Sequence, residues 1–341
     1  MAPPVRVLSL VIVIVLLILP AFAHFNLVLG SAKSIEIRML TYNIWFSDEK
    51  MRERMDALGE IVEDLEPDLL TFQEVTLDNL AILQEQRWIS RYHLVPPNAA
   101  QEGKRHFVVI LSSYPVERWQ VYQLKNSPRS NRTLVVAETK SSVSSVGVKF
   151  VIATTHLRHS GYNTRIREQQ LKETFKIISA YDNVCVMGDL NIEDKVDGDV
   201  VLPSPWIDAW LSIPGNTDSN GFTWDRSKTP FASVLESTLN ATSYQARLDR
   251  VLCKLPDFKV KEMRIVGDKV TKAGILASDH FGLFTIIELA ERTEHKLDNS
   301  KMSQTESEVY FNRPAGWETL IGGNPATLKS QRKQKIVRDG L

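Results

Sequence analysis

Cysteine is scarce in this 341-residue chain, and neither sign of charge is in excess. Two cysteines are too few for a disulfide-rich scaffold or a cysteine-rich zinc domain. Equal numbers of basic and acidic residues, 41 of each, exclude a polybasic nucleic-acid coat protein and an acidic disordered chain. Cys185 and Cys253 each lie in an apolar run, so we expect buried thiols in strands rather than a disulfide pair.

Several sequence motifs are also missing. The chain has no internal repeat, no Cys/His spacing typical of structural zinc, no Gly-Xaa-Ser-Xaa-Gly elbow and no phosphate-binding glycine loop. These absences argue against repeat scaffolds, α/β-hydrolases and P-loop enzymes. The 43% hydrophobic content nevertheless suffices for a full globular core.

The amino-terminal segment 1–34 has the composition of a targeting signal. Arg6 precedes the apolar run Val7–Leu19, Pro20 interrupts it, and small residues follow. This pattern is typical of a secretory signal peptide. The apolar character continues to about residue 29, so an uncleaved membrane anchor formed by residues 7–29 is the alternative. Either form predicts a secreted or membrane-associated protein.

At the other end, residues 291–341 predict a polar and flexible tail. Phe311 and Trp317 are two aromatic residues in it, and they either form a docking peptide or fold back onto the core. Between the two ends, residues 35–290 carry 30 basic and 34 acidic side chains, a net charge of −4. A core of this charge does not coat DNA non-specifically, and any phosphate it handles must be bound locally with the help of a metal cation.

The core shows strand and helix patterns in alternation. The apolar periodicity predicts helices over 51–65, 79–88 and 165–179. It predicts strands over 35–42, 69–72, 107–111, 133–139, 150–155, 184–187, 248–255 and 283–289. The mixture predicts an α/β (α+β) fold with two packed mixed β-sheets flanked by helices.

Carboxylate, amide and imidazole side chains, which can bind metals or take part in catalysis, recur where these strands end. Such positions on a rigid scaffold are where catalytic groups usually lie, although each residue alone has an alternative role in a turn, a cap or an ion pair. The residues are Asn43, Gln73, Glu74, His156, Asp189, Asn191, Asp279 and His280.

The combination suits hydrolysis of a phosphodiester. A hard cation such as Mg²⁺ binds carboxylate oxygens, which Glu74 and Asp279 supply. Asp189 is a carboxylate that can activate water. Donors for the phosphoryl oxygens are then available from Asn43, Asn191, His156 and His280.

These residues, in this order and together with Arg247-Leu248-Asp249, resemble the endonuclease/exonuclease/phosphatase superfamily. The resemblance implies a four-layer α/β sandwich over residues 35–290, which is the catalytic domain. Within the superfamily the chain is most similar to the tyrosyl-DNA phosphodiesterases, in stretches such as Leu70–Thr76, Gly188–Asn191 and Ser278–Leu283.

That resemblance implies a role for each site residue. Glu74 and Asp279 hold Mg²⁺, for which Mn²⁺ can substitute, and Asn43 lies beside both metal and phosphate. Asp189 activates water, and Asn191 and His156 contact the phosphate. His280 stabilises the transition state and is oriented by Asp249. Trp224 packs against the nucleotide, with a core aromatic as the alternative. The implied substrate is a DNA 5′ end, and the implied compartment is the nucleus.

Three functions therefore compete. The first is hydrolysis of 5′-tyrosyl-DNA bonds in DNA repair. The second is a secreted or membrane-tethered nuclease or sphingomyelinase-like phosphodiesterase, which the leader favours. The third is a non-catalytic binding module, which predicts that a residue such as Glu74 or His280 is missing, whereas all are present. One departure from the resembling enzymes is His106, which stands where they carry tyrosine.

Overall fold

The computed structural model describes the folded core and one segment of the carboxy-terminal region. The residues described are 35–101, 103–125, 132–140, 147–159, 163–229, 231, 245–290 and 309–313. They belong to one compact unit that begins at Glu36. The leader predicted over residues 1–34 lies outside the described residues. None of the helices within the described ranges is long and apolar enough to cross a membrane.

The first sheet has six strands in the order β14-β15-β1-β2-β4-β3. β1 and β2 are parallel, and the other neighbours are antiparallel. Its strands are β1 (Glu36–Asn43), β2 (Leu69–Val75), β3 (His93–Val95), β4 (Phe107–Ser112), β14 (Phe258–Val266) and β15 (Gly282–Leu289).

The second sheet also has six strands, in the order β10-β13-β8-β7-β6-β5. Only β7 and β8 are parallel. Its strands are β5 (Val116–Gln123), β6 (Thr133–Thr139), β7 (Val151–Thr155), β8 (Val184–Asp189), β10 (Ile207–Asp208) and β13 (Asp249–Lys254).

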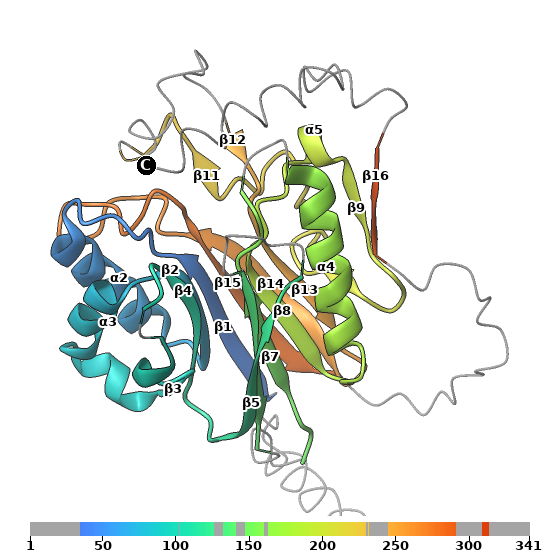
Figure 1. Ribbon diagram of the computed structural model, residues 1–341, viewed down its shortest axis with the longest axis horizontal. Helices are drawn as coiled ribbons and strands as arrows, with labels where there is room; N and C mark the ends of the chain where they lie inside the picture. The colour runs from blue at the N-terminus through green and yellow to red at the C-terminus, as the bar shows by residue number, and fades with distance from the viewer. Residues whose placement is uncertain are drawn as a thin grey trace, which may run out of the picture. The chain divides into compact units, whose positions relative to one another are not determined.

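Each parallel pair is connected by a helix that crosses its sheet. Helix α2 (Met51–Leu65) links β1 to β2, and α4 (Thr164–Ile178) links β7 to β8. Figure 1 shows α2 and α3 (Leu77–Gln84) on the outer side of one sheet and α4 on the outer side of the other. The layers are therefore helix, sheet, sheet and helix, and the predicted four-layer sandwich is confirmed.

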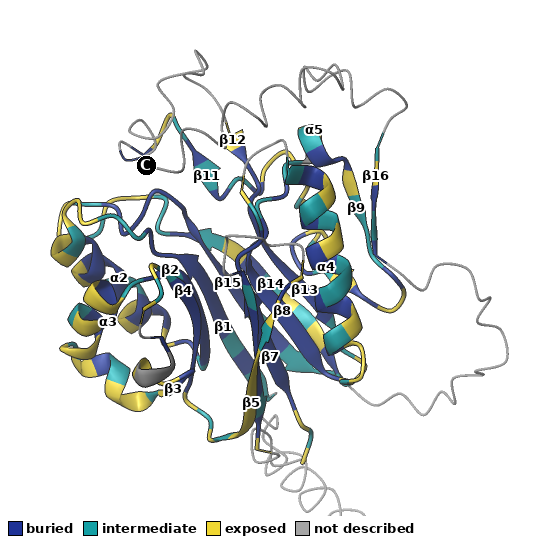
Figure 2. Ribbon diagram, viewed as in Figure 1, coloured by how far each residue is buried: buried dark blue, intermediate teal, exposed yellow. Residues whose placement is uncertain are grey.

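Apolar side chains fill the three spaces between these layers. Ile37 and Met39 of β1 meet Ile152 and Met187 of the second sheet in the central layer. Leu58 and Val62 of α2 pack on the outer face of the first sheet. Figure 2 shows that the strands are buried and that the outward faces of the helices are exposed. Leu171, Phe175 and Ile178 of α4 cover the second sheet in the same way.

The cysteines depart from the prediction of free thiols. Cys185 of β8 and Cys253 of β13 are both fully buried, as expected, but they form a disulfide. The two residues are direct partners across the antiparallel β8–β13 pair, with their Cα atoms 4.2 Å apart. Sequence spacing does not reveal this register, because 68 residues separate the two positions.

One segment of the predicted tail folds back onto the core, as one of the two alternatives for Phe311 expects. Strand β16 (Tyr310–Asn312) pairs antiparallel with β9 (Asp199–Val201), and the two lie side by side in Figure 1. Val309 and Phe311 are buried in the cluster that covers α4. Residues 309–313 are ordered because these apolar side chains gain burial and the strand gains ladder hydrogen bonds. The rest of residues 291–341 lies outside the described residues.

The topology brings the candidate residues to one edge of the sandwich. Asn43 ends β1 and Gln73 lies next to it across the parallel pair with β2. His156 follows β7, and Asp189 ends β8, which runs parallel to it. Antiparallel strands contribute from their beginnings, so Asp249 opens β13 opposite Asp189. His280 likewise precedes β15, which runs antiparallel to β1.

Candidate active site

Buried threonines and a glutamine form the floor of the site between the two sheets. The side-chain amide of Gln73 donates to the hydroxyls of Thr41 and Thr71 on its own sheet, at 3.2 and 3.3 Å. It also donates to Thr154 of β7 at 3.1 Å. This polar bridge fixes the distance between the sheets directly beneath the catalytic edge, because buried polar groups must be satisfied.

Asp189 lies at the centre of the site. Its Oδ2 accepts a hydrogen bond from Asn43 Nδ2 at 2.9 Å and lies 3.2 Å from His156 Nε2. Its Oδ1 accepts from the backbone N–H of Asn191 at 2.9 Å. Burial raises the pKa of Asp189 to about 6, while the nearby His280 and these hydrogen bonds oppose the rise. A buried carboxylate titrating near neutrality is typical of a functional site.

The backbone at the end of β8 positions Asp189 and Asn191. A Cβ on Gly188 would lie 2.2 Å from the carbonyl oxygen of Thr155, so β8 approaches β7 closely just before Asp189. Asn191 adopts a left-handed backbone with φ 51°, and its side chain donates to Leu157 O at 3.2 Å. A strained conformation that surrounding contacts maintain is common at catalytic edges.

His280 and Asp249 form a buried ion pair. Their Nδ1 and Oδ2 atoms are 2.9 Å apart, and Asp249 is fully buried. Burial of the His280 ring opposes its protonation, but Asp249, Asp189 and Asp279 outweigh it and raise the pKa of His280 well above its ordinary value. The Nε2 atom of His280 lies 3.9 Å from Asp189 Oδ2. The pair therefore places a positive charge at the centre of the site.

Glu74 is the second-to-last residue of β2 and has a left-handed φ of 58°. Its Oε2 accepts a hydrogen bond from Phe46 N at 3.2 Å, and its Oε1 lies 4.0 Å from His156 Nε2. Burial, followed by the charge of Asp279, raises the pKa of Glu74 to about 7. Burial also raises the pKa of Asp279, whose Oδ1 accepts from the Ser278 hydroxyl at 3.2 Å. Two carboxylates that repel one another, one buried and one half-buried, are a donor set suited to a hard divalent cation.

A second group, Asp189, Asp249 and His280, also offers ligand atoms within 4.8 Å of one another. We favour the Glu74 and Asp279 pair as the metal ligands. The Nδ1 of His280 is already paired with Asp249, and a protonated imidazole has no lone pair for a metal. No such restriction applies to the carboxylate oxygens of Glu74.

His156 and Trp224 complete the predicted set. Burial, then the charge of Arg132, lowers the pKa of His156 well below its ordinary value, so its ring is neutral. Trp224 begins the short strand β11 (Trp224–Asp225) and is half-buried. The preceding Thr223 ties it to the site, because its hydroxyl accepts from Asp249 N at 3.0 Å and its carbonyl from Phe281 N at 2.6 Å.

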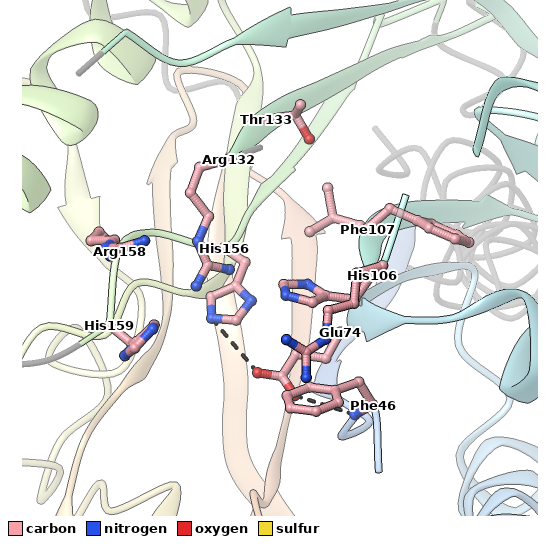
Figure 3. Close-up of a pocket in the computed structure, with 11 residues that line it drawn as sticks. Phe46, Glu74, His106, Phe107, Arg132, Thr133, His156, Arg158 and His159 are labelled. Atoms are coloured by element: carbon pink, nitrogen blue, oxygen red, sulfur yellow. Dashed lines mark hydrogen bonds and ion pairs between the residues drawn. The ribbon is translucent and has the colours of Figure 1, made fainter. Parts of the chain in front are cut away.

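A pocket of about 310 Å³ opens beside Glu74 and His156. Figure 3 shows Arg132, Arg158 and His159 on one side of His156, with Phe46, Glu74 and His106 on the other. Its remaining lining residues are Arg105, Phe107, Val108 and Thr133. His106 stacks on Phe46 with ring centroids 5.6 Å apart, and burial lowers its pKa to about 4.

Most of the described core matches one known protein family. Residues 40–280 match the model of the Endonuclease/Exonuclease/phosphatase family. The chain belongs to this family. The predicted enzyme class, a metal-dependent phosphodiesterase, is thereby confirmed.

Two named proteins and one crystal structure are similar to this chain. The 5′-tyrosyl-DNA phosphodiesterase of Caenorhabditis elegans is 27% identical over 260 residues, covering 74% of this chain and 67% of that protein. The Caenorhabditis briggsae protein of the same name is 29% identical over 205 residues, covering 58% and 55%. The crystal structure of TDP2 from C. elegans superposes with a TM-score of 0.62 at 26% identity, covering 75% of this chain and 74% of that one. The predicted resemblance is thus confirmed.

Sequence reasoning missed one positioning residue in this family member. Arg54 of α2 is fully buried, and its guanidinium donates to the carbonyls of Ile44, Trp45, Ser47 and Glu49 at 2.5 to 3.4 Å. It thereby fixes the loop that follows β1, whose Phe46 N–H binds Glu74. In the sequence Arg54 looks like one more charged position on an amphipathic helix, so nothing there predicts this contact.

The arginines of the pocket were also missed. Arg132 and Arg158 each stand beside a strand end, but three-dimensional structure alone brings them together with Arg105. Burial, opposed by Glu74 and Asp189, lowers the pKa of Arg132 only to about 10, so the side chain is a cation at neutral pH.

Proposed function

We propose that this enzyme is a Mg²⁺-dependent phosphodiesterase that hydrolyses the bond between tyrosine and the 5′ phosphate of DNA. The observation that carries the proposal is the buried constellation around Asp189, in which Asn43, His156 and His280 surround one carboxylate beside Glu74. The two curated relatives named 5′-tyrosyl-DNA phosphodiesterase support the choice of substrate.

Glu74 and Asp279 are the residues that would hold the metal. Their mutual charge repulsion and burial fit a divalent cation, and the hydrogen bond from Phe46 N leaves one oxygen of Glu74 for it. When bound, such an ion neutralises the phosphate and stabilises the departing oxygen. Mn²⁺ prefers the same oxygen donors and can substitute.

Asp189 is the general base. A carboxylate with a pKa of about 6 is largely ionised at pH 7 and still basic enough to take a proton from water. Asn43 fixes one of its oxygens and the Asn191 N–H the other, so the base is held in one orientation. This preorganisation reduces the cost of reaching the reactive geometry.

The phosphoryl oxygens would be bound by His280, His156 and the amide of Asn191. His280 is charged because Asp249 faces its other ring nitrogen, and a preformed cation stabilises the charge that develops on phosphorus-bound oxygens. His156 faces the same space through its Nε2 atom, which lies 3.2 Å from Asp189 Oδ2 and 4.0 Å from Glu74 Oε1. Trp224 would stack on the adjoining nucleotide.

A tyrosyl leaving group suits this site. A phenol has a pKa of about 10, so its oxyanion departs with less protonation than an alkoxide needs.

The test is a comparison of substrates on one preparation of the protein. We expect kcat/KM for a short 5′-tyrosyl single strand to exceed that for an intact duplex and for sphingomyelin. Asp189→Asn protein serves as the control for contaminating activity. Faster cleavage of the unmodified duplex or of the lipid would reject the tyrosyl substrate and leave the phosphodiesterase assignment in place.

The second candidate is a secreted or membrane-tethered relative that acts on another phosphodiester. The disulfide between Cys185 and Cys253 favours it, because structural disulfides persist mainly in oxidising compartments. A nuclear enzyme, as the resemblance to DNA-repair enzymes implies, would keep these thiols reduced. Fractionation of cells that express the full chain distinguishes the two compartments.

A further inference from the structure

The pocket beside Glu74 carries more positive charge than the scissile phosphate can use. Arg105, Arg132 and Arg158 line it, and Glu74 is its single carboxylate. A phosphodiester has one negative charge, and Glu74 is already committed to the metal in the proposed function. The further phosphates of the DNA extend from the 5′ oxygen, so on the side of the leaving group at least one guanidinium has no counter-charge from the nucleic acid.

Within the part of the chain that the structure describes, no carboxylate forms an ion pair with these arginines. Arg132 is only 6% exposed, and its Nε has no hydrogen-bond partner in the described part of the chain. The described carboxylates form no ion pair with Arg105 or Arg158, although Arg105 lies over the Phe46 ring at 5.2 Å. Leaving a buried cation unpaired is costly, so a site of this kind is built for an anion that arrives from outside.

The pocket borders Glu74 and His156 but not the water-activating group of the proposed function. Glu74 lines it, whereas Asp189, His280 and Trp224 do not. In an in-line displacement, water attacks from one side of phosphorus and the leaving group departs from the other. With Asp189 activating the water as proposed, we assign the space beside Glu74 to the leaving group.

The walls also suit an aromatic ring with a charged group beyond it. Phe46 and His106 form a stacked pair along one wall, and Arg132 and Arg158 lie across from them. Resting on the proposed function, we propose that this pocket binds a negatively charged group carried by the leaving side of the substrate, beyond the aryl ring. Carboxylates of an acidic peptide and a phosphate share the required chemistry.

The experiment uses one thymidine oligonucleotide with a series of 5′-aryl esters whose phenols differ only in remote charge. The neutral ester is that of p-cresol, and the cationic ester is that of tyramine. The anionic esters are those of 3-(4-hydroxyphenyl)propanoate and of 2-(4-hydroxyphenyl)ethyl phosphate. We expect one or both anionic esters to exceed the neutral ester in kcat/KM by about tenfold, the worth of one charge-assisted hydrogen bond.

Arginine variants then show which side chains cause the preference for anionic esters. In Arg158→Gln and Arg105→Gln proteins the anionic preference should shrink by about threefold or more, with the p-cresol ester affected least. The matched control is Arg118→Gln, an exposed arginine on the distant part of β5 that pairs with Glu138 and should leave the preference intact. A preference for the carboxylate ester identifies an acidic peptide, and one confined to the phosphate ester identifies a phosphorylated leaving group.

Failure of this inference is distinguishable from failure of the proposed function. Equal rates for all four esters, or fastest cleavage of the tyramine ester, would overturn the anion pocket while the tyrosyl reaction stands. If no aryl ester is cleaved, calorimetric binding of 3-(4-hydroxyphenyl)propanoate and of inorganic phosphate to the protein remains the readout. Binding that is lost in Arg158→Gln would support the pocket, and its absence in unaltered protein would overturn it.

Discussion

Single residues at the catalytic edge divide into groups that react and groups that position them. Asp189 and His280 have pKa values displaced by burial and by each other's charge, as expected for reacting groups. Asn43, Asp249 and Arg54 instead make short hydrogen bonds that fix those groups or the loop around them. Changes in the first class should alter turnover more than stability.

Asp189→Asn tests this division. The substitution keeps the shape and removes the base, so turnover should fall by about 10²–10⁴-fold. The melting temperature should change by only a few degrees, because one hydrogen bond of about 1 kcal/mol is affected. Asp257→Asn, whose side chain bonds Asn183 at the opposite end of β8, is the control. Near-native turnover in Asp189→Asn would remove this residue from the mechanism.

Gly188→Ala tests the close approach of β8 to β7. The new methyl group would meet Thr155 O at 2.2 Å, so we expect a loss of about 1–3 kcal/mol of unfolding free energy. Turnover should fall as well, since Thr155 directly precedes His156. Gly215→Ala is the control, because Gly215 has φ 87° and nothing lies within 4 Å of the added atom. Its loss of stability therefore reports backbone strain alone, without a steric contact. Equal stability losses in the two variants would show that the approach is looser than described.

At the scale of elements, the strands missed in the sequence are edge strands. β5 and β14 lie at the borders of their sheets, and their outward residues are largely polar or exposed. Helix α3 ends at Gln84, earlier than the predicted 79–88 span, and a 3-10 turn over Arg87–Arg91 follows. Central strands were found because burial on both faces gives them continuous apolar runs.

Packing of Phe311 is expected to stabilise strand β16 against local opening. Phe311 is 6% exposed, and Arg313 lies over its ring while pairing with Glu168 at 2.6 Å. Phe311→Ala should lower the free energy of opening this strand by about 3 kcal/mol. Hydrogen exchange of the β9 amides, which pair with β16, measures it, with the exposed Asn312→Ala as control. Unchanged protection of β9 would mean that the strand contributes little.

For the whole molecule, the cation of the proposed function would lie at the catalytic edge, held by Glu74 of β2 and by Asp279, which precedes β15 of the same sheet. Chelation by EDTA should abolish turnover, and added Mg²⁺ or Mn²⁺ should restore it, because the metal supplies several kcal/mol of charge stabilisation. Glu74→Gln should reduce activity by about 10²-fold or more and raise the metal concentration required. Full activity in EDTA would end the metal hypothesis.

The disulfide is the other whole-molecule feature. It joins β8 and β13, the strands that end and begin with Asp189 and Asp249. The Cys185→Ala/Cys253→Ala variant should lose about 2–4 kcal/mol of stability relative to the oxidised protein, because the cross-link no longer restricts the unfolded chain. Denaturant unfolding with and without reductant measures this. Equal unfolding free energies with and without reductant in the unaltered protein would show that the two thiols are not bonded in solution.

The amino-acid sequence by itself determined the layered fold and the identity of the polar residues at the strand ends. Periodicity is a local property, and a strand buried on both faces or a helix with one apolar face can be recognised without knowing its neighbours. For that reason α2, β6 and the residues that end β1, β2, β7 and β8 were predicted at or near their positions.

Only the tertiary structure decided what these residues do to one another. The pKa of Asp189 and the Cys185–Cys253 disulfide both depend on register across strands distant in sequence. The arginine pocket likewise gathers Arg105, Arg132 and Arg158 from separate segments. Electrostatic energies depend on distance and burial, and neither quantity is contained in the spacing of residues along a chain.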